Sequence, residues 1–173
     1  MVGTALRAAL VRREIDFHYT TRRGTGRIEQ CYLDLLNPPV VWPSPRQYDV
    51  VYLVAAIAKF AECERDPATW VVNVDAPIAL ARTFNAAFKV FISSDAVEYA
   101  GNTAYARQKA HVEAYMQTID AAIVRPNRIA PEHAGVFAEF LIEVAETRHV
   151  GVVRWKWTGA PAPAQTQGEV AYG

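Results

Sequence analysis

A tyrosine and a lysine four residues apart, Tyr105 and Lys109, are the pair in this sequence with the clearest potential for chemistry. They lie in the segment NTAYARQKAHVEAY, whose pattern predicts a helix over 103–118. Four residues are close to one helical turn, so both side chains would project from the same face. A neighbouring ammonium group lowers the pKa of a phenol from about 10, which would prepare the tyrosine for proton transfer. Chance also produces such pairs, so the interpretation needs support from elsewhere in the chain.

A pair of serine hydroxyls at the end of a predicted strand provides that support. The segment KVFISS predicts a buried strand over 89–94 that ends at Ser93 and Ser94, ahead of the helix that carries Tyr105. A hydroxyl at this point could orient a carbonyl or alcohol oxygen while the tyrosine passes a proton to or from it. In the alternative reading, the serines only end the strand and the Tyr105 ring packs against the sheet.

The elements that must position these residues alternate between helices and strands. Apolar periodicity predicts helices over 1–13, 75–88, 103–118 and 131–149, with Asp75 as the N-cap of the second helix. It predicts strands over 15–20, 28–35, 48–56, 89–94, 121–126 and 150–157. This alternation is typical of an α/β fold with a mainly parallel sheet, whose ligands bind beyond the carboxyl ends of the strands. Residues 1–157 are expected to form one domain, and 158–173, rich in Ala, Pro and Gln, a flexible tail.

Charge and cysteine content exclude several classes of protein. The 173 residues include 18 basic and 18 acidic side chains, and this balance argues against binding to nucleic acid or to an anionic membrane. No apolar run reaches the roughly 18 residues that a membrane span needs. Cys31 and Cys63 form no CxxC motif, so neither a disulfide framework nor a metal site is expected, and two ordinary thiols favour the cytoplasm.

Five segments, in this order, resemble the extended short-chain dehydrogenases/reductases: DVVYLVAA, NVDAP, VFISSDAV, YARQK and IVRPNRI. These proteins are NAD(P)-dependent nucleotide-sugar epimerases, dehydratases and reductases, and ISSDAV with AAIAKFAECERDP is similar to the dTDP-4-dehydrorhamnose reductase-like branch. The resemblance covers about residues 1–130. It implies a Rossmann-like three-layer fold and an NAD(P)-dependent oxidoreductase or epimerase that acts on a nucleotide-activated sugar.

The resemblance also assigns roles to individual residues. Tyr105 would be the general acid/base, Lys109 would tune its pKa and hydrogen-bond the nicotinamide ribose, and Ser94 would orient the substrate. Asp34 would meet the adenine amino group, and Asn73 matches a family position where a structural role is equally compatible. The full set of implied cofactor-binding residues is Gly3, Arg22, Arg23, Asp34, Leu35, Leu53, Ala55, Ala56, Ser93, Lys109, Pro126 and Asn127.

Two arginines bear on the choice of cofactor. Arg22 and Arg23 follow the predicted strand at 15–20, where an acidic residue would bind a ribose 2′-hydroxyl and favour NAD. Guanidinium groups suit a 2′-phosphate, so the sequence favours NADP over NAD. The alternative is that both are solvated loop arginines.

The sequence departs from the family pattern in three places. The glycine fingerprint is represented only by Gly3, and the first strand, expected between the strands at 15–20 and 48–54, is missing. The loop between Ser94 and Tyr105 is shorter than usual, and most of the C-terminal substrate domain is absent.

The missing strand leads to an expectation about partners. It would leave a gap in the sheet, to be closed by re-pairing, by a strand of another chain or by 150–157, and we expect a homodimer. The alternative function is a truncated, non-catalytic Rossmann-like module that binds a nucleotide or another protein.

Overall fold

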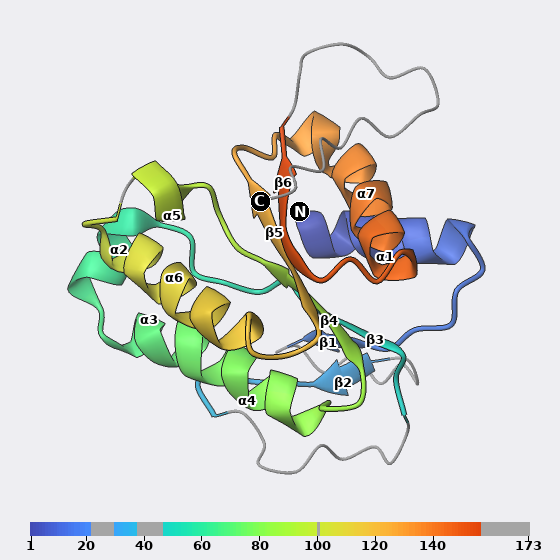
Figure 1. Cartoon of the computed structure of the whole chain (residues 1–173), viewed down its shortest axis with the longest axis horizontal. Coiled ribbons are helices and arrows are strands. Elements are labelled where there is room, and N and C mark those ends of the chain that lie inside the picture. The colour runs from blue at the N-terminus through green and yellow to red at the C-terminus, as the bar shows by residue number, and fades with distance from the viewer. Residues whose placement is uncertain (22–29, 38–46, 100, 157–173) are drawn as a thin grey trace.

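Two parallel sheets hold the strands of this chain in the computed structural model, which describes residues 1–21, 30–37, 47–99 and 101–156 (Figure 1). The strands are β1 (Tyr19–Thr21), β2 (Gln30–Tyr32), β3 (Val50–Leu53), β4 (Phe88–Ile92), β5 (Ala121–Pro126) and β6 (Gly151–Trp155). The helical elements are α1 (Val2–Arg12), α2 (Phe60–Arg65), α3 (Ala68–Trp70), η1 (Val71–Asp75), α4 (Ala76–Thr83), α5 (Ala96–Tyr99), α6 (Ala104–Met116), η2 (Pro131–His133) and α7 (Ala134–Glu146).

The larger sheet is the centre of a three-layer sandwich. Its four strands are parallel and follow the order β3-β4-β5-β6. Along β4, Val90 packs in the cluster that contains residues of α1 and α7, whereas Phe91 packs in the cluster that contains residues of α4 and α6. Successive side chains of a strand point to opposite faces, so helices cover both faces of the sheet (Figure 1). The predicted Rossmann-like α/β fold is therefore confirmed.

The smaller sheet is separate and leaves an open edge on the larger one. β1 pairs in parallel with β2, and within the described residues β3 pairs only with β4. β6 pairs with β5 at the opposite edge, so the option that 150–157 closes the gap beside β3 is wrong. A hydrogen bond of 2.9 Å between His18 Nδ1 and the Tyr48 hydroxyl ties together the segments that precede β1 and β3.

Several predicted boundaries differ from the observed ones. Asp75 is not an N-cap: it has helical dihedral angles, and a continuous helical segment runs from α3 through the π-helical turn η1 into α4. Pro77 lacks the N–H that would continue the regular hydrogen-bond ladder, and the π-helical turn lies directly before it. α4 ends at Thr83, five residues before β4 begins at Phe88, and α5 was not predicted.

Three further sequence predictions concern the start of β1, the absence of a membrane span and the tail. β1 begins at Tyr19 rather than at residue 15, and Glu14, just after α1, adopts a positive φ of 55°. None of the helices in the described ranges is long and apolar enough to cross a membrane. The predicted tail at 158–173 lies outside the described residues.

Candidate functional site

Ser94, Tyr105 and Lys109 come together just beyond the carboxyl end of β4. The Thr103 side chain caps α6 by accepting a hydrogen bond of 3.2 Å from the Ala106 N–H, and Tyr105 and Lys109 follow on that helix. The Ser94 side chain lies beside the Tyr105 hydroxyl, near enough to act on its pKa. The Ser94 Oγ accepts a hydrogen bond of 3.2 Å from the Ala96 N–H. The hydroxyl at the strand end and the tyrosine on the helix are therefore neighbours.

The Lys109 ammonium is buried close to this pair, and the Glu113 carboxylate is also near it. Its Nζ donates a hydrogen bond of 2.8 Å to the Ile92 carbonyl oxygen and lies 4.7 Å from the Phe91 ring centroid. The distance from Nζ to the Tyr105 ring centroid is 5.8 Å. Burial lowers the pKa of Lys109 from 10.5 to about 8, so the side chain is mostly cationic at neutral pH.

The Tyr105 hydroxyl has a higher pKa than a free phenol. Burial raises the pKa, while the Ser94 side chain lowers it, and the charges of Cys63 and Asp95 raise it further. The ring is 7% exposed and the Phe60 ring covers it, with 5.2 Å between the two centroids. The lowering expected from the sequence is wrong for the protein alone, because desolvation outweighs the favourable contacts.

The sequence did not single out three residues that surround Tyr105. Cys63 and Phe60 of α2 lie against it, and the Cys63 thiol donates a hydrogen bond of 3.3 Å to the Ile57 carbonyl oxygen. Asp95 follows Ser94 directly, and burial raises the pKa of its carboxyl group while the Ser94 side chain acts in the opposite direction. The position of Asp95 directly after Ser94 was an available signal, whereas no spacing pattern marks the two α2 residues.

The Ser93 hydroxyl is committed to a buried ion pair. It donates a hydrogen bond to Oε1 of Glu113, a carboxylate that also accepts from Nε and Nη2 of Arg125 at 2.9 and 2.5 Å. Arg125 Nη1 donates to Glu98 Oε1 at 2.7 Å. These partners raise the pKa of Arg125, and the two arginines beside Glu98, Arg154 first, lower the pKa of that carboxyl group. Ser93 thus anchors the strand end rather than facing Tyr105.

The other predicted cofactor-binding residues lie on several elements. Gly3 is in the first turn of α1, with open space where a Cβ would be, and Asp34 follows β2, where its Oδ1 accepts a 3.1 Å hydrogen bond from the Leu36 N–H. Leu53 is buried at the end of β3, and Leu35 packs in the same apolar cluster. Arg22 and Arg23 lie outside the described residues.

Four further predicted residues follow the ends of β3 and β5. After β3, Ala55 is exposed and Ala56 is half-buried. Pro126 ends β5 and is buried, and the Asn127 Oδ1 accepts a hydrogen bond of 2.6 Å from the Arg128 N–H. Asn73 ties the segment after β3 to α6, because its side chain bonds to both backbone groups of Ile57 and to Gln108 Oε1, all within 2.9 Å.

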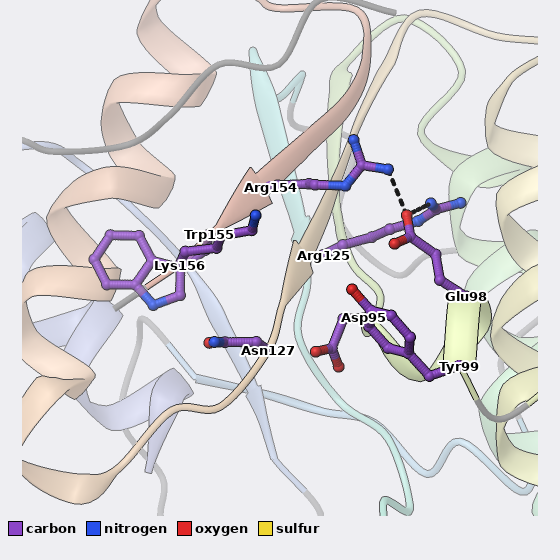
Figure 2. Close-up of a pocket in the computed structure, with 8 residues that line it drawn as sticks. All are labelled: Asp95, Glu98, Tyr99, Arg125, Asn127, Arg154, Trp155 and Lys156. Carbon is purple, nitrogen blue, oxygen red and sulfur yellow. Dashed lines mark hydrogen bonds and ion pairs between the residues drawn. The ribbon is translucent and has the colours of Figure 1, made fainter. Parts of the chain in front are cut away.

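A pocket of about 450 Å³ opens beside this site (Figure 2). Asp95 and Tyr99 line one side, and Asn127 and residues 154–156 line the other. Asp95 directly follows Ser94 and lies close enough to Tyr105 to raise its pKa, so the pocket adjoins Ser94 and Tyr105. It lies beyond the carboxyl ends of β4 and β5, where a parallel sheet binds ligands.

Burial of the Lys109 charge should lower the free energy of unfolding, and replacing Lys109 with a neutral residue should remove this penalty. The difference between a pKa of 10.5 and about 8 corresponds to a penalty on the order of 3 kcal/mol at pH 7, and loss of the bond to Ile92 offsets about 1 kcal/mol of the gain. We expect Lys109→Met to raise the free energy of unfolding in urea at pH 7 by about 1–2 kcal/mol. Lys59→Met, at an exposed position, should change it little.

The pH dependence of this difference follows from the same shift. Between pH 8 and 10.5 the folded protein has released the Lys109 proton, whereas the unfolded chain still holds it. The free energy of unfolding of the wild-type protein therefore increases with pH over this range. The advantage of Lys109→Met should therefore shrink between pH 7 and pH 10. An advantage that stays constant over that range would show that Lys109 is not the titrating group.

Comparisons with known proteins place this chain in a family. The profile of the NAD dependent epimerase/dehydratase family matches residues 1–133. A hypothetical dTDP-4-dehydrorhamnose reductase from Sulfolobus tokodaii is similar in structure, with a TM-score of 0.69 and 19% identity over 88% of this chain and 71% of its own. Among proteins of curated function, none matches the sequence.

Two further solved structures share the fold. Bordetella bronchiseptica WbmH, in complex with NAD+, has a TM-score of 0.63 and 13% identity over 89% of this chain and 71% of its own. A UDP-galactose 4-epimerase has a TM-score of 0.59 and 21% identity over 84% of this chain and 59% of its own. At these identities, the similarity establishes the architecture of the chain.

Proposed function

The chain belongs to the NAD dependent epimerase/dehydratase family, and on that premise we propose that it is an NAD(P)-dependent enzyme acting on a nucleotide-activated sugar. The observation that carries the proposal is that Ser94 lies beside the Tyr105 hydroxyl, with the Lys109 ammonium 5.8 Å from the Tyr105 ring centroid. A hydroxyl, a phenol and a cation in one water-poor site form a proton-transfer unit.

The proposed reaction transfers a proton at a substrate oxygen. The Ser94 hydroxyl would hydrogen-bond the carbonyl or alcohol oxygen and hold it against the Tyr105 hydroxyl. Tyr105 would give a proton to that oxygen or take one from it, and the Lys109 cation would stabilise the phenolate that remains. The bound nicotinamide would supply hydride exchange at the neighbouring carbon.

The residues present fit a nicotinamide cofactor at the end of the sheet. An ammonium group has three N–H donors, and the bond to Ile92 uses one, so Lys109 retains donors for ribose hydroxyls. Leu53 and Ala56 offer an apolar surface after β3, and Asn127 lies at the end of β5. Arg22 and Arg23 would bind the 2′-phosphate of NADP, which is the cofactor we propose, with NAD as the alternative.

Titration with NADPH and NADH tests the proposal. We expect calorimetry to give micromolar binding of NADPH, with NADH about 10-fold weaker, because a guanidinium–phosphate contact contributes about 1.5–3 kcal/mol. Arg22→Ala should reduce the preference for NADPH and leave NADH binding unchanged. Arg12→Ala, at an exposed surface ion pair, is the matched control and should change neither affinity.

The opposite result would support the second function. If neither cofactor binds at millimolar concentration, the chain is better described as a non-catalytic Rossmann-like module that binds another partner. The cytoplasmic location favoured by the two cysteines stays a prediction.

We further propose that the protein is a homodimer. The supporting observation is the edge of β3, which pairs on one side only within the described residues and carries half-buried Val50, Val51 and Tyr52. Light scattering at micromolar concentrations should give the mass of a dimer. Val51→Lys should shift the mass toward a monomer, whereas Val150→Lys, at a 57% exposed position before β6, should not. A monomeric wild-type protein would contradict this proposal.

A further inference from the structure

We propose that the pocket beyond β5 and β6 binds the diphosphate of the nucleotide-activated sugar through Arg154 and Lys156, with the sugar directed toward Asp95 and Ser94. The inference rests on the proposed function, because it names how the same site would hold its substrate. It depends on the strand register, on the charges that line the pocket and on the position of Ser94.

The orientation of β6 places two cations on one face of the sheet. The Trp155 ring packs against α7, with centroid distances of 5.3 Å to Phe137 and 5.1 Å to Phe140. Alternate residues of a strand point to opposite faces, so Arg154 and Lys156 share the face opposite this aromatic cluster. Both line the pocket, as Figure 2 shows.

The register of β5 and β6 adds a third cation to the same face. Arg125 pairs with Arg154 across the two strands, an arrangement of like charges that destabilises a sheet unless an anion joins them. Here one oxygen does so, because Glu98 Oε1 accepts from Arg125 Nη1 at 2.7 Å and from Arg154 Nη2 at 2.5 Å. On this face of the sheet, two arginines therefore share one carboxylate oxygen.

The cationic side chains on this face differ in how many of their N–H donors already bond to carboxylates. Arg125 is 14% exposed and holds both Glu113 and Glu98. Arg154 is 39% exposed and uses one nitrogen, Nη2, for Glu98. Lys156 makes no ion pair or hydrogen bond with any residue of the described ranges. Arg154 and Lys156 thus keep donors that a phosphate oxygen can accept.

The opposite end of the pocket sets the direction of the ligand. The Asp95 carboxyl group lies there, next to Ser94 in the chain, and Figure 2 shows it across the pocket from Asn127. Carboxylate and amide groups suit sugar hydroxyls, and Asp95, which has no ion pair in the described part of the chain, would repel phosphate. The Glu98 carboxylate at the other end of the pocket is instead paired with both Arg125 and Arg154. A volume of about 450 Å³ is within the range of small-molecule pockets. The diphosphate therefore belongs at Arg154 and Lys156, and the sugar at the end beside Ser94.

Calorimetry with UDP-galactose, UDP and NADPH tests the inference on the full chain. Replacing both cations (Arg154→Gln with Lys156→Gln) should weaken UDP-galactose and UDP about 10-fold and leave NADPH unchanged. The control removes two surface cations, Arg12→Gln with Lys59→Gln, and should leave all three affinities unchanged. Lys156→Glu alone, which breaks no contact in the described structure, should weaken UDP-galactose without altering the melting temperature.

Each other outcome overturns the inference. A loss of NADPH affinity in the double variant would assign the pocket to the pyrophosphate of the cofactor. An equal loss in the control pair would show that only overall charge matters. If the wild-type protein binds NADPH but not UDP-galactose or UDP, the inference fails while the cofactor part of the proposed function stands. If it binds none of the three, the proposed function fails as well.

Discussion

Tyr105→Phe is expected to reduce turnover about 10³-fold while leaving the affinity for NADPH unchanged. The substitution removes only the hydroxyl that exchanges a proton with the substrate, and general acid–base catalysis contributes about 10²–10⁴-fold. The ring and its packing against Phe60 remain, so the fold should be unaffected. The measurement is kcat on the nucleotide sugar that the wild-type protein converts, with UDP-galactose tested first.

A matched tyrosine on the same helix provides the control for this experiment. Tyr115→Phe removes the hydroxyl of a half-buried side chain that contacts Arg82, and turnover should stay within about 2-fold of wild type. If Tyr105→Phe keeps a tenth of the wild-type kcat or more, another group transfers the proton. Absence of wild-type turnover on every nucleotide sugar tested would contradict the enzymatic proposal itself.

The pH profile of kcat/KM gives a second readout of the same unit. The pKa of Lys109 is about 8 in the free protein, so the cation that stabilises the Tyr105 phenolate disappears as pH rises through this value. Turnover should therefore fall on the alkaline side of pH 8. Burial raises the pKa of Tyr105, so the tyrosine itself does not produce this limb.

The parts of the fold that were predictable from the sequence are those that local patterns determine. β4 is buried at all five positions and β5 at five of six, and continuous apolar runs predicted both within two residues. Asp75 was misassigned because Asp is a typical N-cap residue, whereas the chain here continues the helix through a π-helical turn. That outcome depends on packing around the turn and not on the local residue types.

The same distinction applies to the candidate site. The proximity of Ser94 and Tyr105 could be anticipated because each follows from one element, a strand end and a helix face. The cover formed by Phe60 and Cys63 could not, because α2 reaches Tyr105 only through the tertiary fold. The pKa shift of Tyr105 was predicted with the wrong sign for the same reason, since desolvation depends on the enclosure of the ring.

Removing the arginine of the buried ion pair should have the largest effect on stability. Arg125→Met removes the guanidinium paired with the Glu113 carboxylate, 4% exposed, and leaves the Ser93 hydroxyl as its hydrogen-bond partner among the contacts described. An uncompensated buried charge costs about 3–5 kcal/mol. We expect a loss of this size in the free energy of unfolding measured in urea at pH 7. Arg12→Met, which removes a partner of an exposed ion pair, should cost less than about 1 kcal/mol.

A double variant separates the effect of charge from that of packing in this loss of stability. A second substitution, Glu113→Leu, should recover much of the stability at pH 7, because apolar pairs can replace buried ion pairs with little net cost. A deficit that persists in the double variant would instead assign the loss to the packing of the Arg125 side chain between α5 and α6.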